Sequence, residues 1–286
     1  MLSFLLLCML PCVLAWDSVR LLFTLVLSSD TFSQIPVIPL VSLFLIYENR
    51  KAIFAEVSFA WLLGAALITS GMILIIASRL RLWQLGSTNS LSLLVLALVF
   101  VWLGAFALFF GTRAFRAASF PLLFLLFMVP IPEPILSKTI YVLQTGSSEL
   151  AEAFFGIAGV PYHRQGFVFE LPGVMIRVAE ECSGIRSTLA LMITTVLASY
   201  IFLKRSWKRL VLCVAVVPIA ILKNGLRIAT LSILAVYVNP AFLEGNLHRR
   251  GGIVFFVIAL VPMALLLRLL QNGDNEIPAA VKDGRR

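Results

Sequence analysis

The most regular feature of the chain is a series of long apolar runs separated by short polar or basic segments. A helix needs about 20 apolar residues to cross the hydrocarbon core of a bilayer, and many of these runs approach that length. The pattern predicts an all-α polytopic membrane protein with about eight transmembrane helices. The predicted spans are a first run at 2–27, then 36–47, 54–77, 91–110, 117–129, 185–203, 210–238 and 253–270.

One stretch between spans, 130–184, is less apolar and is expected to form structure outside the bilayer. Residues 134–156 carry apolar positions near one face, which is typical of an amphipathic helix in the membrane interface. Segments 167–171 and 174–179 flank a Pro-Gly pair and predict a short β-hairpin before Cys182. The chain is expected to form a single integral membrane domain, 1–286, composed of N-terminal helices 1–129, the extracytoplasmic segment 130–184, C-terminal helices 185–271 and a cytoplasmic tail 272–286.

Composition supports the membrane interpretation and narrows the possible functions. Hydrophobic residues make up 60% of the chain and charged residues 13%, whereas soluble domains are about half apolar and a quarter charged. A net charge of +9 could indicate a nucleic-acid-binding protein, but the basic residues form short clusters between apolar runs instead of one basic surface. We therefore expect no nucleic-acid partner, and the surroundings of the protein are membrane lipid.

The basic clusters also predict the orientation of the spans, because basic loops tend to stay in the cytoplasm. This rule places segment 130–184 on the outer face of the membrane. Arg79 and Arg81 then fall outside, against the rule. The clusters assigned to the cytoplasm are 50–51, 113–116, 204–209 and 282–286.

Whether Cys182 and His248 lie on the same face of the membrane depends on how many times the apolar segment 208–238 crosses it. Two spans would leave roughly 15 residues each, too few for a crossing, so one long helix kinked at Pro218 is the better interpretation. With a rise of about 1.5 Å per residue, Arg227 lies roughly 27 Å from the cytoplasmic end of that helix. Arg227 can therefore share the outer face with Cys182 and His248.

Cys182 has the polar surroundings that a cysteine nucleophile needs. It stands at the predicted start of a helix, where the helix dipole favours a thiolate, and Arg186 and Arg227 would add positive charge. Glu180 and Glu181 act in the opposite direction, because carboxylates beside a thiol raise its pKa. The alternative is an inert interfacial cysteine, and the polar context favours a functional one.

The other cysteines and the histidines offer no metal site. Cys8, Cys12 and Cys213 lie in apolar runs, and no pair of cysteines has metal-ligand spacing with histidine, so we expect neither a metal nor another cofactor. His248 lies just before the last span and is a candidate for proton transfer. His163 precedes the hairpin and is interpreted as a surface residue.

Arg227 lies in the most apolar part of the chain, where an arginine is costly unless it faces water, an anion or a partner. It is therefore a candidate functional residue. The alternative is that Lys223 and Arg227 only extend to the outer headgroups, and for Lys223 this alternative is strong.

Three short motifs follow one another in the C-terminal half. They are Glu-Glu-Cys-Ser-Gly-Ile-Arg-Ser at 180–187, Asn-Gly-Leu-Arg at 224–227 and His-Arg-Arg-Gly-Gly at 248–252. This ordered set resembles the pattern of the exosortase/archaeosortase family, and the resemblance covers 160–270. A weaker resemblance in 29–50 has Gln34 where the early motif of the family often has histidine.

The resemblance implies a membrane-embedded cysteine transpeptidase in which Cys182 is the nucleophile and Arg227 and His248 complete the site. Its substrates would be exported proteins with a C-terminal signal made of a proline-glutamate-proline-like motif, a transmembrane helix and a basic tail. Cleavage would pass through a thioacyl intermediate at the periplasmic face of a bacterial cytoplasmic (inner) membrane, with the acceptor left open. The supporting or substrate-binding residues would be Glu181, Ser183, Arg186 and Asn224.

Two other functions remain possible from the sequence. A transporter or channel would use Lys223 and Arg227 to line a path, but the two halves show no inverted repeat and no matched pair of broken helices. An intramembrane serine protease using Ser183 is the weaker alternative, since no histidine lies at a comparable depth within a predicted span.

Overall fold

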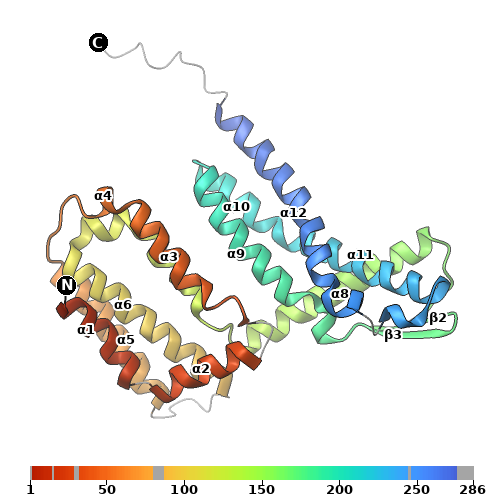
Figure 1. The fold of residues 1–286 in the computed structure, drawn as a ribbon, viewed down its shortest axis with the longest axis horizontal. Coiled ribbons are helices and arrows are strands. Elements are labelled where there is room, and N and C mark those ends of the chain that lie inside the picture. Colours follow the sequence, from red (N-terminus) through yellow and green to blue (C-terminus); the bar gives the residue numbers. More distant parts are fainter. Residues whose placement is uncertain (1, 15, 29–31, 80–86, 244–245, 276–286) are drawn as a thin grey trace. The chain divides into compact units, whose positions relative to one another are not determined.

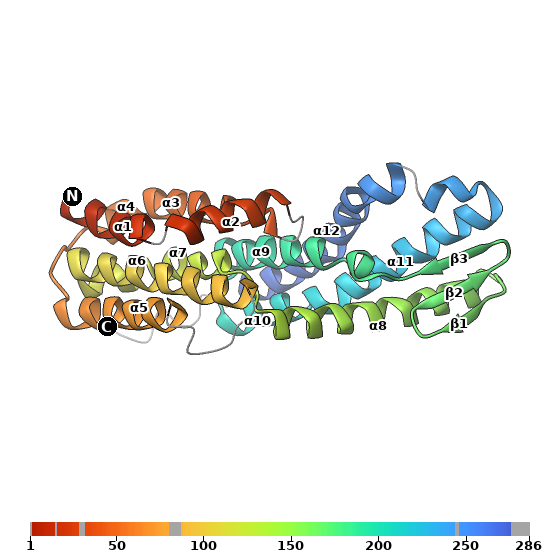
Figure 2. The same cartoon turned by 90° about the horizontal axis from the view of Figure 1, so that it is seen from below.

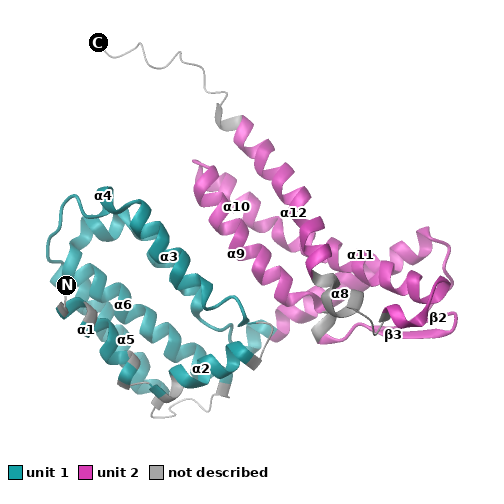
Figure 3. Ribbon diagram, viewed as in Figure 1, with its two compact units in different colours: residues 1–136 teal, residues 137–286 magenta. Residues whose placement is uncertain are grey.

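The computed structural model describes residues 2–14, 16–28, 32–79, 87–243 and 246–275. Some side chains within these ranges are not described, including those of Glu181, Cys182 and His248. The chain forms two compact units, residues 1–136 and 137–286 (Figure 3). The predicted tail, 272–286, begins inside the last helix and from residue 276 lies outside the described residues.

The first unit is helical, and its helices α5 and α6 pack through glycine. A Cβ on Gly64 would lie 2.7 Å from the Cβ of Leu108, and one on Gly71 would lie 2.8 Å from the carbonyl oxygen of Ala97. Small residues permit such close approach of membrane helices. The elements are α1 (Leu2–Leu14), α2 (Trp16–Ser28), α3 (Val37–Glu48), α4 (Arg50–Ile53), α5 (Trp61–Arg79), α6 (Ser87–Ala117), α7 (Ser119–Phe124) and η2 (Leu125–Met128).

The second unit combines helices with a small antiparallel sheet (Figures 1 and 2). Strands β2 and β3 pair from Val168 opposite Arg177 to Leu171 opposite Val174. The elements are α8 (Glu133–Ile157), β1 (His163–Gln165), β2 (Val168–Leu171), β3 (Val174–Arg177), η3 (Glu180–Ser183), α9 (Ile185–Phe202), α10 (Ser206–Val214), α11 (Val216–Tyr237), η4 (Pro240–Leu243) and α12 (Asn246–Asn275). Strand β1, which pairs with β2, was not predicted from the sequence.

Five helices among the described residues are long and apolar enough to cross a membrane. A sixth crossing results if the bent pair Ser119–Met128 and Glu133–Ile157 counts as one broken span. The protein is therefore a mostly helical, multi-pass membrane protein, with fewer long apolar helices than the roughly eight spans expected from its sequence. The predicted spans at 2–27 and 36–47 are occupied by short helices: α1 and α2 in the first and α3 in the second, of 12 or 13 residues each.

Helices α10 and α11 together form one span of 32 residues, Ser206–Tyr237, in agreement with a single crossing in this region. The break between them lies at Ala215, three residues before Pro218. Proline has no backbone N–H to bond the carbonyl of residue 214, and its ring crowds that carbonyl, so the helix bends just before it.

Helix α8 has the extent predicted from its amphipathic pattern but not the predicted place. Gly146 packs on Ile221, and Gly225 packs on Leu150, so residue numbers rise together along α8 and α11. The two helices run side by side in the same direction, and α8 does not lie alone in the membrane interface. The polar face of α8 is used for this packing, because Ser147 accepts a hydrogen bond from α11.

The sheet is held against the C-terminal parts of α8 and α11. Phe169 of β2 is fully buried in a cluster with Phe155 of α8 and Ala229 of α11. Arg164 of β1 pairs with Glu152 of α8, and the hydroxyl of Tyr162 donates a hydrogen bond of 3.2 Å to the same carboxylate. Partial burial and this hydrogen bond raise the pKa of Tyr162.

Helices α9 and α12 run opposite to α11. The start of α9 lies beside Lys223, whereas Leu203, just past its end, packs with Leu212 of α10. Near the end of α12, the carbonyl oxygen of Leu270 accepts a hydrogen bond of 2.6 Å from Lys208. The starts of α9 and α12 therefore lie toward the same end of α11, which is also the end that carries the sheet.

Candidate active site

Cys182 lies in η3, the short helical turn that connects β3 to α9. The turn ends at Gly184, which has φ +80° and so adopts the left-handed conformation that favours glycine. Ser183 next to it is only 1% exposed, so its hydroxyl is not available to a substrate. The residue order Cys-Ser-Gly thus places the cysteine backbone at the entry to a membrane helix.

Gly184 also brings this turn against α11. A Cβ on residue 184 would lie 3.0 Å from Oδ1 of Asn224 and 3.4 Å from Nζ of Lys223. The 3.0 Å distance is tight, so a Cβ at position 184 would require the Asn224 side chain to shift, and the positive φ would strain any other residue there. Glycine thus allows the turn to lie against these two side chains of α11.

Asn224 connects α11 to α8 inside the unit. It is 1% exposed, and its Nδ2 donates a hydrogen bond of 3.1 Å to Oγ of Ser147. One turn earlier on α8, Nε2 of Gln144 donates a hydrogen bond of 2.9 Å to the carbonyl oxygen of Val178, just before η3. Gln144 thus holds the chain just before the turn that carries Cys182, and Ser147 holds Asn224 on the neighbouring α11. Neither residue was predicted from the sequence as part of the site. Their spacing of three residues on one helix face was the available signal.

Lys223 does not extend to the lipid headgroups. It is 6% exposed, and its ammonium group donates a hydrogen bond to Oγ of Ser187 on α9. The serine hydroxyl in turn donates a hydrogen bond of 2.9 Å to the carbonyl oxygen of Gly184. The interpretation of Lys223 as a lysine that reaches the outer headgroups is therefore wrong, because a closer polar partner lies on the neighbouring helix.

Arg227 lies on α11 one turn beyond Lys223 and is partly buried. Since α9 and α11 run in opposite directions, the chain that precedes Gly184 lies beside the part of α11 that follows Asn224. The backbone of Cys182 therefore enters near the level of Arg227. Arg186, in the first turn of α9, has an exposed side chain.

The backbone of His248 can be placed by the register of α12 against the α10–α11 span. Lys208 bonds Leu270, and these helices run in opposite directions. His248 lies 22 residues before Leu270. The residue 22 positions after Lys208 is Thr230, which lies one turn from Arg227. His248 thus begins α12 near the level of Arg227, while its side chain and those of Glu181 and Cys182 lie outside the described residues.

Other candidate groups lie away from this arrangement. His163 is an exposed residue of β1, with Nε2 3.2 Å from the side-chain amide of Gln165. Cys213 is partly buried in α10. Among the described residues, no group of three or more His, Cys, Asp or Glu side chains could hold a metal ion.

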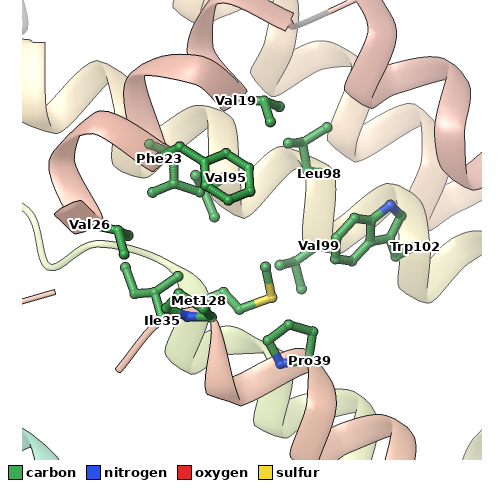
Figure 4. Close-up of a pocket in the computed structure, with 12 residues that line it drawn as sticks. Val19, Phe23, Val26, Ile35, Pro39, Val95, Leu98, Val99, Trp102 and Met128 are labelled. Atoms are coloured by element: carbon green, nitrogen blue, oxygen red, sulfur yellow. The ribbon is translucent and has the colours of Figure 1, made fainter. Parts of the chain in front are cut away.

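The first unit contains a cavity of about 260 Å³ between α2, α3 and α6 (Figure 4). Its lining is apolar: Phe23, Val95 and Met128 point into it, and Trp102 lies at its edge. The indole N–H of Trp102 donates a hydrogen bond of 3.1 Å to the carbonyl oxygen of Cys8. Such a lining supplies no acid, base or nucleophile.

The family model of transmembrane exosortases (Exosortase_EpsH) matches residues 16–265 of this chain. The chain belongs to the transmembrane exosortase family. Comparisons with curated proteins and with solved structures find no match. Membership in this family favours a protein-sorting cysteine peptidase or transpeptidase over a transporter or channel, and it covers both units of this exosortase.

Proposed function

We propose that this exosortase is a cysteine transpeptidase that cleaves C-terminal sorting signals of exported proteins at the outer face of the membrane. The observation that carries the proposal is the contact of Gly184 with α11, which sets the backbone of Cys182 near the level of Arg227. The register of α12 supports His248 as the third member. The three residues come from η3, α11 and α12, and the opposite directions of α11 and its neighbours α9 and α12 support their assignment to one site.

In the first step, the Cys182 thiolate attacks the carbonyl carbon of the scissile peptide bond, and the carbonyl electron pair moves to the oxygen. Arg227 donates N–H groups to this developing oxyanion. As the intermediate collapses, the C–N bond breaks, and His248 protonates the leaving amine. The products are a thioacyl enzyme and the released transmembrane segment of the substrate.

In the second step, His248 takes a proton from the attacking amine or water, which adds to the thioacyl carbonyl. The C–S bond then breaks and returns the Cys182 thiolate. Arg227 serves the same oxyanion position in both halves of the reaction. This sequence needs no metal, oxidant or nucleotide.

The neighbouring residues take different roles. Ser183 and Asn224 are buried, so they hold the turn and α8 in place and do not touch the substrate. Arg186 has an exposed side chain at the start of α9 and suits the glutamate of a proline-glutamate-proline-like motif. The side chain of Glu181 lies outside the described residues, and its supporting role is carried by the resemblance alone.

The substrate signal fits a site at the outer end of a helical bundle. A substrate with a transmembrane helix and a basic cytoplasmic tail would present the peptide just outside its own helix at this depth. The host membrane is then the bacterial cytoplasmic membrane, and the acceptor is an amine, water, lipid or glycan nucleophile.

Cys182→Ala separates the enzyme from a transporter. We expect this variant to reach the membrane in normal amounts and to leave a tagged substrate uncleaved, because the thiolate is the nucleophile. Cys213→Ala is the matched control and should cleave at the normal rate, since Cys213 is a partly buried packing residue of α10. Normal cleavage by Cys182→Ala would exclude the proposed chemistry, and equal loss in both variants would indicate damage to folding.

A further inference from the structure

Lys223 is a buried cation of the second unit with no assigned role. It lies in the apolar α11 span with 6% of its surface exposed. A buried ammonium in a membrane helix costs several kcal/mol unless a polar or anionic partner compensates it. The partner that the structure describes is the neutral hydroxyl of Ser187, which solvates the ammonium without neutralising it.

The contacts of Lys223 with described residues of α9 and the preceding turn lead toward Cys182. Its ammonium bonds Ser187, Ser187 bonds the carbonyl oxygen of Gly184, and the ammonium lies 3.4 Å from the position of a Cβ on Gly184. Gly184 is two positions after Cys182, so their Cα atoms are at most about 7 Å apart. The positive charge is therefore buried directly beside the turn.

We propose that Lys223 is a positioning residue that holds Cys182 as a thiolate in the resting enzyme. This inference rests on the proposed function, because it concerns the same nucleophile. Glu180 and Glu181 directly precede Cys182 in the sequence, and neighbouring carboxylates disfavour a thiolate, so cations must offset them if the thiol is to ionise near neutral pH. Lys223 is the cation best suited to this, because water screens a buried charge least.

The roles of the two cations on α11 then differ. Lys223 lies against the turn through Ser187 and Gly184 and acts before substrate binds. Arg227, one turn farther along, offers a planar set of donors to the oxyanion that forms during the reaction. Repulsion between two cations one helical turn apart makes a stable anion between α9 and α11 more favourable.

Several other groups bear on the ionisation of Cys182. Among its buried polar side chains, α8 presents only the neutral Gln144, Ser147 and Ser148 toward the interior of the unit. The charged or titratable groups on the surrounding elements include Glu149 and Glu152 of α8, Arg177 of β3, Glu180 and Glu181 of η3, Arg186 of α9, Arg227 of α11, and His248, Arg249 and Arg250 of α12.

The test measures the ionisation of Cys182 directly. In full-length protein carrying Cys8→Ala, Cys12→Ala and Cys213→Ala, the thiolate of Cys182 displaces iodide from iodoacetamide. The alkylation rate is followed from about pH 5 to pH 10, which brackets an ordinary thiol pKa near 8.5. We expect the midpoint of the unsubstituted Lys223 protein to lie below that ordinary value, and a midpoint at or above it would overturn the proposal.

Lys223→Met should raise the midpoint by at least about one pH unit, the effect of removing a nearby opposite charge. Lys223→Arg should keep the midpoint low, because it keeps the charge. Lys208→Met is the matched control: Lys208 is also buried, at 3% exposure, but bonds Leu270 at the other end of the span. Its midpoint should equal that of the parent protein.

Equal midpoints in Lys223→Met and the parent protein would overturn the proposal. Equal midpoints are the result expected if Glu181, and not the thiolate, neutralises the charge of Lys223. If Lys223→Met does not fold, Ser187→Ala decides, because it releases the lysine from its anchor: a raised midpoint supports the proposal, and an unchanged one overturns it. Alkylation needs no sorting substrate. Failure of the proposed function, seen as a lack of substrate cleavage, is therefore distinguishable from failure of this inference.

Discussion

Lys208 and Lys223 are buried lysines of the same membrane span, and they satisfy their ammonium groups differently. Lys208 bonds the backbone carbonyl of Leu270 near the end of α12. Lys223 bonds a side chain beside the candidate nucleophile. Arg227 follows one turn later and is only partly buried, so its donors can reach a substrate. Burial and partner identity thus separate three cations that the sequence presents as equivalent charges in an apolar stretch.

Replacement of Arg227 by lysine tests whether the geometry of its donors matters. Lysine keeps the charge but loses the planar donor set, so the cleavage rate should fall by about 10²-fold, the scale of losing an oxyanion donor. Pull-down of an uncleaved tagged substrate should remain normal. Cleavage near the wild-type rate would remove arginine-specific stabilisation from the mechanism, and normal cleavage by His248→Ala would remove the histidine.

At the scale of elements, the close contact between α8 and α11 holds the site together. Gly225 faces Leu150 and Gly146 faces Ile221, so two glycines allow the helices to approach. Gln144 then donates a hydrogen bond to the carbonyl oxygen of Val178, just before the turn that carries Cys182, and Ser147 accepts one from Asn224 of α11. The polar face of α8 is thus part of the packing.

Gly225→Ala should weaken this packing. The added Cβ would lie 2.7 Å from the Cβ of Leu150, and such overpacking costs about 1–3 kcal/mol. Gly156→Ala in α8 is the control, because a Cβ there meets nothing within 4 Å, and alanine should stabilise the helix by up to about 1 kcal/mol. Thermal unfolding in detergent would compare the two variants. Equal stability in both would show that α8 and α11 do not pack through this glycine.

The sequence predicted which segments are helical better than it predicted their partners. Apolar length defined α9, expected at 185–203 and observed at Ile185–Phe202, because crossing a membrane requires such a run. The amphipathic pattern of α8 defined its ends but not its place, since a polar face turned toward a neighbouring helix looks the same as one turned toward water. The same ambiguity hid Lys223, whose partner lies 36 residues away on another helix.

The candidate site was predictable in part for the same reason. The motifs around Cys182, Arg227 and His248 mark the residues, and helix direction brings their backbones to one end of the unit. What the motifs cannot specify is the set of contacts that fix the turn, such as Gln144 to Val178, because these depend on the register of three helices. The roles of the three residues stay predictions until the variants are measured.

At the scale of the whole molecule, the number of crossings decides which face carries the site. If α7, η2 and α8 count as one broken span, six crossings keep the basic clusters at 50–51, 113–116 and 204–209 on the cytoplasmic side. If they do not cross, α9 starts in the cytoplasm and the 204–209 cluster faces outward. The positive-inside rule therefore favours six crossings, with the sheet and the start of α9 outside.

Cysteine labelling at three exposed positions tests this arrangement in a background without native cysteines. Ala117→Cys lies at the end of α6 and Ser206→Cys at the start of α10, whereas Gln165→Cys lies at the end of β1. With α8 as part of a crossing, a membrane-impermeant maleimide added to intact cells should label only position 165, and positions 117 and 206 should react only after permeabilisation. Labelling of 165 and 117 from the same side would show that α8 does not cross. If both positions face the cytoplasm, the start of α9 and the candidate site also face the cytoplasm and the 204–209 cluster faces outward, which would exclude cleavage of exported proteins in the orientation proposed.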